Sequence, residues 1–403
     1  MTRGDTLLVF FDLPYVRGSD GIYCQDAFWI FLERVGEGFE RMVVLGRVTT
    51  DAEAPRYRCC GAGGKIEFHA LPRYSSLYAV GEVARSLPAL FRRIWGPVGG
   101  CDAMLVASPH PWSLALWCVG KLRGKRIAFM VRQDTPAYVS HRAPARGRRL
   151  VLLGARLLEA SFVRLSRSVL TFAVGDPVAA RYRRARGPVH SILISTVRAE
   201  TIAAPVTRAP SHPGRARLLW VGRLEPEKRP DLLLTCFRAL CERRPGALDL
   251  DVVGRGPLLA EAESLARRLG VSDRVRLRGY VPHGPELQRL YEAADLLVLS
   301  SASEGFPQVI LEAMARGLPV VTTAAGGIPA LLDDGVNAIL VPCNDADALT
   351  AGVERVLDDP GLQERLRSAG LRFAREHTLE LESERLLRIW DSHFREGPGG
   401  PIE

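Results

Sequence analysis

Two acidic and two basic residues in the second half of the chain have the chemistry to bind a molecule that carries phosphates and a diol. Glu304 and Glu312 are eight residues apart in the segment Ser-Glu-Gly-Phe-Pro-Gln-Val-Ile-Leu-Glu. Arg223 and Lys228 precede them in the segment Arg-Leu-Glu-Pro-Glu-Lys. A carboxylate accepts hydrogen bonds from neighbouring hydroxyl groups, while Arg offers a planar fork and Lys a point charge to phosphate oxygens.

Apolar runs precede both pairs and predict the strands that position them. Residues 217–222 lead into Arg223, and residues 295–300 lead into Glu304. A third apolar run, residues 318–323, follows. Such runs are typical of buried parallel strands. Because parallel sheets bind ligands at the carboxyl ends of their strands, we expect these side chains at one edge of a sheet.

The segment between the second and third runs predicts a helix. Pro307 fits its first turn, where the missing N–H costs nothing, and Gly317 fits the left-handed position that closes it. Gln308 and Glu312 are one turn apart, and we expect both on the helix face that does not pack. An alternative is that the two glutamates are solvated acids flanking a helix start.

The spacing of the two glutamates resembles the E-x7-E signature of glycosyltransferase family 4, whose retaining enzymes have the two-domain GT-B fold. The likeness is strong over residues 215–345. It implies that Glu312 binds the ribose of a nucleotide-sugar donor and that Glu304 lies beside the transferred sugar. It also implies that Arg223 and Lys228 hold the donor diphosphate, and no metal or other cofactor is expected.

Further donor-binding residues follow from the same resemblance. Gly254 belongs to a Gly-Arg-Gly-Pro loop that lacks the third glycine of a dinucleotide fingerprint. Tyr280 stands where relatives cup the base, although a tyrosine at a strand end is as often a packing residue. Residues 324–329 form a loop of small residues whose N–H groups suit phosphate or sugar. The full set is Gly222, Gly254, Tyr280, Val281, Gly305, Phe306, Pro307, Gln308 and Glu312.

The first half of the chain predicts a second sheet of the same kind. Expected strands cover residues 6–12, 41–48, 65–70, 102–107, 126–131, 168–174 and 190–196, and expected helices cover 22–35 and 84–95. This alternation favours a doubly wound parallel sheet. The predicted fold class is therefore α/β, with two Rossmann-like domains facing each other across a cleft.

Composition places the domain boundary in a segment rich in Ala, Pro, Thr and Arg. The expected parts are an acceptor-binding domain over residues 1–197, a linker over 198–213, a donor-binding domain over 214–376, and a helix over 377–396 that returns to the first domain.

Candidate residues on the acceptor side are fewer. His110 follows a predicted strand and is a candidate catalytic base. Members of the resembled family place a histidine after the next strand, where this chain has Arg132 and Asp134 instead. One alternative is that Arg132 or Asp134 takes the place of the missing histidine. Another is that His110 does so, and a third is that no side-chain base is needed. Gly18 and Gly21 are expected in the loop of the first strand-helix unit.

Charge is unevenly distributed along the chain. The chain has 403 residues and a net charge of +9. Residues 121–186 alone contain 16 Lys and Arg and only three acidic residues. Such a block indicates a surface for phosphates or simply a solvated face. We expect an anionic membrane surface as the partner and no nucleic acid. A helix over residues 146–167 gathers Arg146, Arg149, Arg156, Arg164 and Arg167 on one side.

The remaining composition indicates a cytoplasmic protein with a peripheral association to the inner face of the membrane. The eight cysteines have no C-x2-C spacing and are expected as reduced, mostly buried thiols. No apolar run reaches about 18 residues. The predicted function is transfer of a sugar from a nucleotide-sugar to a glycan or lipid-linked acceptor with retention. The alternatives are a non-catalytic phosphate-binding or nucleic-acid-binding protein, and an epimerase or phosphorylase on the same fold.

Overall fold

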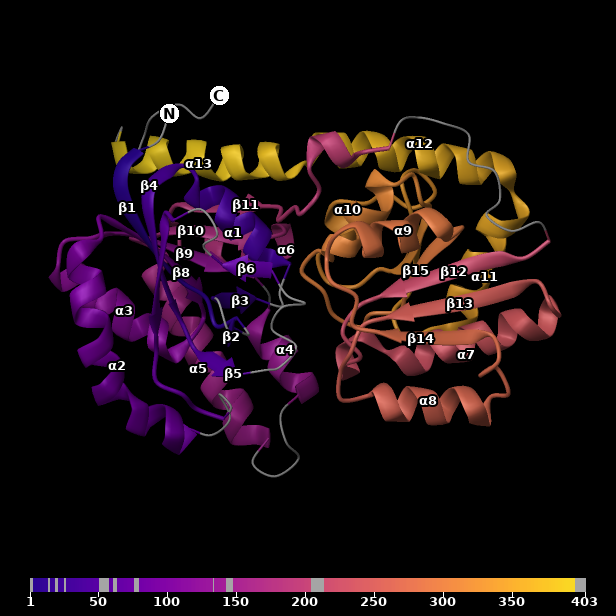
Figure 1. Ribbon diagram of the computed structural model, residues 1–403, viewed down its shortest axis with the longest axis horizontal. Coiled ribbons are helices and arrows are strands. Elements are labelled where there is room, and N and C mark those ends of the chain that lie inside the picture. Colours follow the sequence, from indigo (N-terminus) through magenta and orange to yellow (C-terminus); the bar gives the residue numbers. More distant parts are fainter. Residues whose placement is uncertain are drawn as a thin grey trace. The chain divides into compact units, whose positions relative to one another are not determined.

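The structure is a computed structural model that describes residues 3–13, 15–18, 21–24, 27–50, 58–60, 64–75, 80–132, 134–142, 148–203 and 214–395. The chain divides into two compact units (Figure 1). The first unit comprises Met1–Ile194 with Glu382–Glu403, and the second comprises Ser195–Leu381. Most of the expected linker, residues 204–213, lies outside the described residues.

The first unit is built on a seven-stranded parallel sheet with the order β11-β10-β9-β8-β1-β4-β7. Its strands are β1 (Arg3–Phe10), β4 (Phe39–Gly46), β7 (Ile66–Ala70), β8 (Ala103–Ser108), β9 (Arg126–Val131), β10 (Leu170–Val174) and β11 (Val189–Ile192). The chain proceeds from β1 outward to β4 and β7, and then continues on the other side of β1 with β8. The point where the strand order reverses therefore lies between β1 and β8, the usual place for a ligand in such sheets.

Helices cover the apolar strands of this sheet. They are α1 (Phe28–Gly36), α2 (Val80–Gly100), α3 (Pro111–Leu122), α4 (Thr135–Arg142), α5 (Arg148–Leu165) and α6 (Asp176–Arg183). Leu90, Leu116 and Phe162 from three of these helices lie in one buried cluster with strand residues such as Phe129.

A small four-stranded sheet, with the order β5-β2-β3-β6, was not predicted. Its strands are β2 (Tyr15–Arg17), β3 (Ile22–Cys24), β5 (Val48–Thr50) and β6 (Arg58–Cys60). The prediction of a helix from residue 22 was therefore wrong for its first part. Tyr15 attaches this sheet to β4, because its ring occupies the space of a side chain at Gly46, where an added Cβ would lie 2.5 Å from the ring.

The second unit has a six-stranded parallel sheet with the order β14-β13-β12-β15-β16-β17. Its strands are β12 (Ala216–Val221), β13 (Leu248–Val253), β14 (Val275–Gly279), β15 (Leu296–Leu299), β16 (Val320–Thr323) and β17 (Ile339–Val341). Here the order reverses between β12 and β15. The prediction of two doubly wound α/β units is confirmed.

The helices of this unit are α7 (Pro230–Arg243), α8 (Leu259–Arg268), α9 (Pro285–Ala293), α10 (Gln308–Ala315), α11 (Ala346–Asp358) and α12 (Pro360–Glu376). Short 3-10 helices occur at Pro226–Lys228 (η3) and Ile328–Ala330 (η4). The last helix, α13 (Leu379–Arg395), begins in the second unit and continues into the first, where Trp390 packs edge-on against Phe39 with ring centroids 5.7 Å apart.

Candidate functional site

Lys228 and Glu304 meet at the strand-order reversal of the second unit. Lys228 ends the loop after β12, and Glu304 lies in the loop after β15. The Lys228 ammonium donates a hydrogen bond to Glu304 Oε1, which also accepts from the Ser301 hydroxyl at 2.7 Å. Their side chains are 19% and 11% exposed, respectively, so the pair is largely shielded but reachable. Two residues far apart in sequence thus form one charged pair at the ligand-binding edge of the sheet.

Hydrogen bonds to backbone carbonyl groups fix the positions of these two loops. The Ser300 hydroxyl donates to the carbonyl oxygens of Lys228 and Arg229 at 2.8 and 2.9 Å. The Ala302 N–H donates to the Glu227 carbonyl at 2.7 Å. The Lys228–Glu304 geometry is therefore set by the folded loops and not by the two side chains alone.

Arg223 is the most open of the predicted site residues. Its side chain is 61% exposed, and its guanidinium contacts the Glu225 carboxylate at 3.2 Å. An exposed ion pair of this length contributes little free energy, so an incoming phosphate can replace Glu225 as the partner of Arg223.

Glycines allow the loops of this edge to pack backbone against backbone. Gly254, at φ 138°, lies so close to Gly222 that an added Cβ would be 1.7 Å from the Gly222 carbonyl oxygen. Gly326, at φ 56°, lies equally close to Glu304, with 1.9 Å between an added Cβ and the Glu304 carbonyl oxygen. The prediction that Gly222 and Gly254 belong to one site is consistent with this contact, although their contact with a donor stays a prediction.

Glu312 is buried, and the prediction that it lies on a non-packing helix face was wrong. Its Oε1 accepts from the Thr196 hydroxyl at 2.8 Å and lies 3.4 Å from His283 Nε2, while its Oε2 accepts from the Tyr291 hydroxyl at 2.8 Å. Burial raises the pKa of Glu312, but His283, Tyr291 and Thr196 lower it more. The pKa of this carboxyl therefore lies below its ordinary value, and the group stays ionised. Because a carboxylate has about four acceptor positions, about one remains for a ligand hydroxyl.

The other predicted donor residues surround α10 and β14. Pro307 precedes α10 as its N-cap, with φ −70° and ψ 123°, and so does not lie within the first turn as predicted. Phe306 is buried against Phe373, with ring centroids 6.2 Å apart, which makes its side chain a packing residue. Gly317 has the predicted left-handed conformation, with φ 63°. Gly305, Gln308, Tyr280 and Val281 are partly exposed.

His110 belongs to a buried network at the strand-order reversal of the first unit. It is 4% exposed and caps α3, where its Nδ1 accepts from the Trp112 N–H at 3.1 Å. The ring proton therefore lies on Nε2, which is 2.9 Å from the Tyr74 hydroxyl and 3.6 Å from Asp12 Oδ2. With both ring nitrogens engaged and little exposure, His110 has the environment of a packing and capping residue.

Asp12, Arg47 and Tyr74 complete this network and were not predicted. Arg47 donates to both oxygens of Asp12 at 2.7 and 2.9 Å, and the Tyr74 hydroxyl donates to Asp12 Oδ2 at 2.8 Å. Burial raises the pKa of Asp12, but the hydrogen bonds and charges of His110 and Arg47 lower it well below its ordinary value. Burial beside Asp12 raises the pKa of Tyr74 well above its ordinary value. The network is thus an ionised carboxylate neutralised by one guanidinium.

The remaining acceptor-side candidates are occupied by neighbours. Arg132 lies over the Phe28 ring, 4.1 Å from its centroid. Asp134 pairs with Arg181, whose Nη1 donates to Asp134 Oδ1 at 3.0 Å and also contacts Glu159. Burial raises the pKa of Glu159 above its ordinary value, although Arg181 opposes this.

Gly18 and Gly21 do not belong to the loop that follows β1, contrary to the prediction. They form the turn between β2 and β3, where the Gly18 N–H donates to the Gly21 carbonyl at 2.9 Å. The two glycines therefore close a hairpin of the small sheet.

The predicted basic helix begins at Arg148 and ends at Leu165, so Arg167 lies beyond it and Arg146 lies outside the described residues. Three of its leucines are exposed: Leu150 by 75%, Leu153 by 52% and Leu157 by 61%. Their spacing of three and four residues places them on one helix face.

Cysteine burial is less complete than expected. Cys24, Cys101 and Cys236 are buried, while Cys118 is exposed and the other four are partly exposed. No helix in the described part of the chain is long and apolar enough to cross a bilayer. The described residues include no cluster of three or more His, Cys, Asp or Glu arranged to hold a metal ion.

Comparison with known proteins identifies relatives of the second unit. Residues 208–373 match the family described as Glycosyl transferases group 1. A D-inositol 3-phosphate glycosyltransferase of Kribbella flavida is 37% identical over 181 residues, which cover 43% of this chain and 42% of that protein. One from Actinosynnema mirum is 38% identical over 184 residues, or 43% of each chain. This chain therefore spans less than half the length of the curated relatives it matches.

Solved structures match nearly the whole chain. Anabaena HepE in complex with UDP-glucose has a TM-score of 0.70 at 17% identity and covers 96% of this chain and 100% of its own. A sucrose-phosphate synthase from Thermosynechococcus elongatus has a TM-score of 0.75 at 19% identity, with coverage of 98% and 100%. WaaG, an enzyme of lipopolysaccharide biosynthesis, has a TM-score of 0.71 at 16% identity, with coverage of 95% and 99%. These likenesses establish the predicted GT-B fold.

Proposed function

We propose that the chain is a retaining glycosyltransferase of the glycosyl transferases group 1 family, whose model residues 208–373 match. In this proposal it moves a sugar from a nucleotide-diphosphate-sugar to an acceptor hydroxyl. The bond between the anomeric carbon and the donor phosphate breaks, the bond to the acceptor oxygen forms, and the hydroxyl proton leaves with the diphosphate or with solvent.

The observation that carries this proposal is the Lys228–Glu304 pair at the strand-order reversal of the second unit. A leaving diphosphate gains negative charge as the glycosidic bond breaks, and a prepositioned ammonium stabilises that charge in proportion to its growth. Glu304 holds Lys228 in place and has a second carboxylate oxygen, which is available to a sugar hydroxyl. Arg223, which is exposed and weakly paired, supplies a second cation to the diphosphate.

Donor binding uses the buried Glu312 differently from our initial expectation. Thr196, Tyr291 and His283 already occupy most of its acceptor positions. We therefore assign one ribose hydroxyl, and not the whole diol, to this carboxylate. His283, like Thr196, lies next to Oε1 of Glu312, and we assign it as a further donor-binding residue.

The acceptor proton does not go to His110 in this proposal. Both ring nitrogens of His110 are engaged, and the side chain is buried among Phe10, Tyr74 and Trp112. Proton removal is therefore left to the donor phosphate oxygens or to solvent, neither of which requires a side-chain base.

A donor panel tests the function directly. Each nucleotide-sugar is scored by its effect on thermal unfolding, and products are then identified by mass spectrometry with glycan and lipid-linked acceptors. One donor is expected to raise the unfolding temperature and to be consumed. Arg223→Ala is expected to lose this effect, whereas Arg238→Ala, which removes an exposed arginine paired with Glu242 elsewhere on the unit, keeps it. Absence of binding by every nucleotide-sugar contradicts the proposal.

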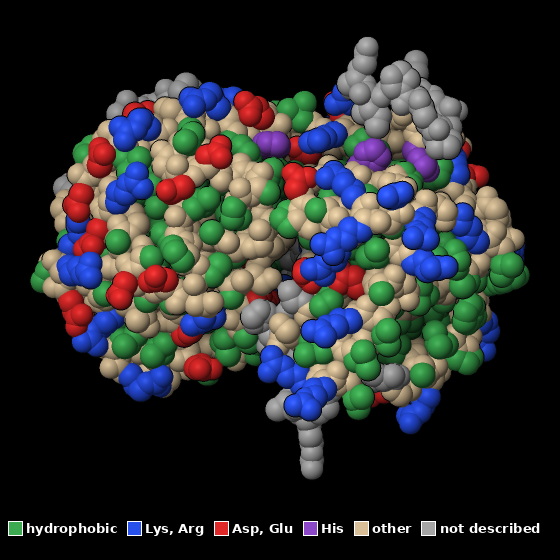
Figure 2. All heavy atoms as spheres, turned by 180° about the vertical axis from the view of Figure 1, so that it is seen from behind, with side chains coloured by type: hydrophobic (Ala, Val, Ile, Leu, Met, Phe, Trp, Pro, Cys, Tyr) green, Lys and Arg blue, Asp and Glu red, His purple; other side chains and the backbone are tan. Residues whose placement is uncertain are grey.

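We further propose that α5 docks on an anionic membrane surface that presents the acceptor. Leu150, Leu153 and Leu157 are exposed together, and Arg149 and Arg156 are exposed on the same helix. Exposed leucines flanked by cations are typical of helices that lie in a membrane interface. Figure 2 shows Lys and Arg side chains lying among hydrophobic ones on one face of the molecule. Each cation near an anionic leaflet contributes about 1 kcal/mol.

Vesicle co-sedimentation tests the docking. The wild type is expected to sediment with anionic vesicles at low salt and much less with neutral ones. Leu150→Ser with Leu157→Ser should reduce binding about 100-fold, since each removes about 1.5 kcal/mol of apolar transfer and every 1.4 kcal/mol is tenfold. Val336→Ser removes an exposed apolar side chain of the second unit and serves as the control. Equal binding to neutral vesicles removes this part of the proposal.

A further inference from the structure

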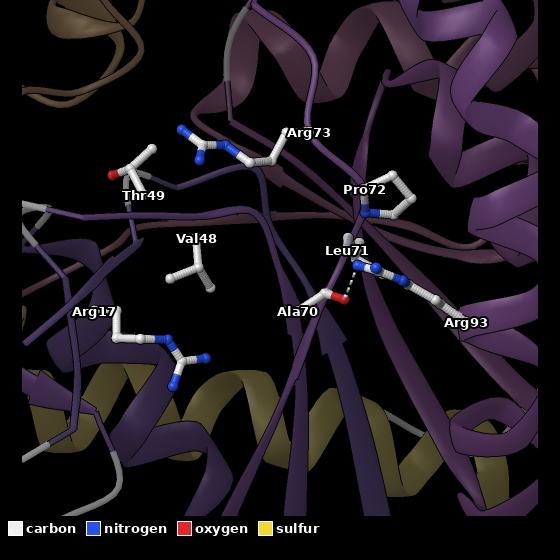
Figure 3. A pocket seen from close by; sticks show the side chains of 8 residues that line it. All are labelled: Arg17, Val48, Thr49, Ala70, Leu71, Pro72, Arg73 and Arg93. Atoms are coloured by element: carbon white, nitrogen blue, oxygen red, sulfur yellow. Dashed lines mark hydrogen bonds between the residues drawn. The ribbon is translucent and has the colours of Figure 1, made fainter.

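A pocket in the first unit is lined by three arginines and is separate from the residues considered so far. Its volume is about 450 Å³, and it lies where the loop after β7 meets β2, β5 and α2. We name it the arginine pocket. Its lining comprises Arg17, Val48, Thr49, Ala70, Leu71, Pro72, Arg73 and Arg93 (Figure 3).

The three arginines reach the pocket from different elements. Arg17 ends β2, Arg73 follows β7, and Arg93 belongs to α2 (Figure 3). Arg93 Nη1 donates to the Ala70 carbonyl at 3.0 Å, which fixes this side chain against the pocket wall and leaves its other N–H groups. No carboxylate among the described residues lines the pocket or lies within ion-pair distance of these three arginines.

Arg47 differs from the three pocket arginines because a structural ion pair neutralises its charge. It immediately precedes Val48 of the pocket lining, yet its guanidinium is bound by both oxygens of Asp12 and by the Tyr74 carbonyl. Arg47 is therefore neutralised, whereas no carboxylate in the described part of the chain pairs with the three pocket arginines. Gathering like charges around one cavity costs electrostatic free energy, which a bound anion removes.

The position and shape of the pocket favour a phosphate ester over other anions. Ala70 ends β7, so the pocket lies at the carboxyl edge of the parallel sheet, where such sheets bind ligands. A phosphate monoester carries about two negative charges, so a pocket lined by several arginines stabilises it more than it stabilises the single charge of a carboxylate. The volume is within the range of small-molecule sites, and Val48, Leu71 and Pro72 offer an apolar wall for the rest of the molecule.

We propose that the arginine pocket binds a phosphate monoester and that this group is carried by the acceptor. The statement about the acceptor rests on the proposed glycosyl transfer, whereas phosphate binding by the pocket does not. The pocket thereby selects an acceptor that is already phosphorylated, so a kinase or another phosphoryl-transfer reaction precedes this one.

Titration calorimetry on the full chain tests the binding. Excess UDP first fills the donor site, and inorganic phosphate, glucose 6-phosphate and glucose are then titrated. Inorganic phosphate and glucose 6-phosphate are expected to bind, and glucose is not. Arg17→Gln and Arg73→Gln should each weaken binding about 10- to 100-fold, the usual effect of losing a charge-assisted hydrogen bond.

Arg92→Gln is the matched control. It removes an exposed arginine from α2, next to Arg93 in sequence, that does not line the pocket. This variant should change phosphate affinity less than about twofold, as expected for an exposed charge outside the contact shell. No saturable binding of inorganic phosphate to the wild type, or equal losses in Arg92→Gln and Arg17→Gln, overturns the proposal.

A second measurement separates this proposal from the proposed function. With an accepted donor, transfer to phosphorylated acceptors should exceed transfer to their dephosphorylated forms, and Arg17→Gln should abolish that preference without changing donor hydrolysis. Donor hydrolysis with no preference for phosphate removes the acceptor claim alone. Phosphate binding without any nucleotide-sugar binding removes the glycosyl-transfer function alone.

The source of the phosphate is decided by competition. Vesicles containing phosphatidic acid, a lipid phosphate monoester, are added to the complex with glucose 6-phosphate, and phosphatidylcholine vesicles serve as the control. Displacement by phosphatidic acid assigns the pocket to a lipid headgroup. Retention of glucose 6-phosphate assigns it to a soluble phosphorylated acceptor.

Discussion

The two sheets of this protein reverse their strand order in the same way, yet the residues at the two reversal points differ in how much they can still bind. In the first unit Asp12, Arg47 and Tyr74 use their polar groups on one another, and His110 is buried beside them. In the second unit Lys228 and Ser301 both donate to Oε1 of Glu304, and the hydrogen bonds among the described residues leave Oε2 open. Position at a ligand-binding edge is therefore not sufficient evidence for a site, because the first set uses both oxygens of its carboxylate internally and the second uses only one.

The largest expected effect comes from removing the cation of the second unit. Lys228→Ala should lower kcat about 100- to 1,000-fold, because the charge that Lys228 meets grows toward the transition state. Donor affinity should change much less. Single-turnover kinetics with saturating donor measure this effect, and Lys121→Ala, an exposed lysine of the first unit, is the control. Full activity of Lys228→Ala contradicts the metal-free charge model. Loss of wild-type activity on treatment with EDTA also contradicts it.

The network of the first unit should affect stability in place of chemistry. Asp12→Asn leaves Arg47 without its carboxylate partner and should cost about 2–3 kcal/mol of unfolding free energy, somewhat less than for a fully buried pair. Denaturant unfolding measures the loss. The Asp12 pKa in the folded state lies below its ordinary value of 3.8, so its stabilisation is present above about pH 4 and is lost as pH falls.

The difference in stability between wild type and Asp12→Asn should therefore be largest near neutral pH and shrink below about pH 4. A difference that stays constant from pH 7 to pH 3 contradicts the assignment of an ionised Asp12. Activity that falls far more than stability would indicate that Asp12 contacts substrate.

An intermediate effect is expected for the buried carboxylate of α10. Glu312→Ala should weaken donor binding by about 1–2 kcal/mol, since about one hydrogen bond to a ribose hydroxyl is lost. It also leaves the Thr196 and Tyr291 hydroxyls without an acceptor and should lower the unfolding temperature. Donor titrations are made well below that temperature, and a 2′,3′-dideoxy nucleotide should bind wild type and variant equally. Unchanged affinity for the normal donor removes the ribose assignment.

The smallest expected effect is at His110. Asn caps helices well and can accept from the Trp112 N–H, so His110→Asn should lose about 1 kcal/mol of stability or less. Turnover should fall less than about tenfold, below the range of a general base. A loss above 100-fold with intact donor binding would make His110 a catalytic base and erase the contrast between the two reversal points.

Sequence reasoning found the second unit well because its signals are local. The strands that position Arg223 and Glu304 are continuous apolar runs, and Gly317 marks the end of α10 by a conformation that glycine adopts easily. Charged residues placed directly after such runs come together whenever the strands are neighbours. Lys228 and Glu304 therefore meet although they are far apart in sequence.

What the sequence did not predict depends on distant partners. Glu312 has no local sign of burial, since Tyr291, His283 and Thr196 approach it from other segments. The small sheet consists of three-residue strands, which are too short to show a period of two residues. The arginines of the pocket come from three elements, and no spacing rule relates them.

The close approach of Gly254 to Gly222, and of Gly326 to Glu304, also sets a limit on how the donor specificity of this protein can be changed. Each loop packs closely against the backbone of its neighbour. A single loop grafted from a relative would therefore clash with a neighbouring loop whose backbone follows a different course. The exchangeable modules are therefore pairs: the loop after β12 with that after β13, and the loop after β15 with that after β16. Recombination libraries that keep these pairs together should yield more folded variants than libraries that separate them.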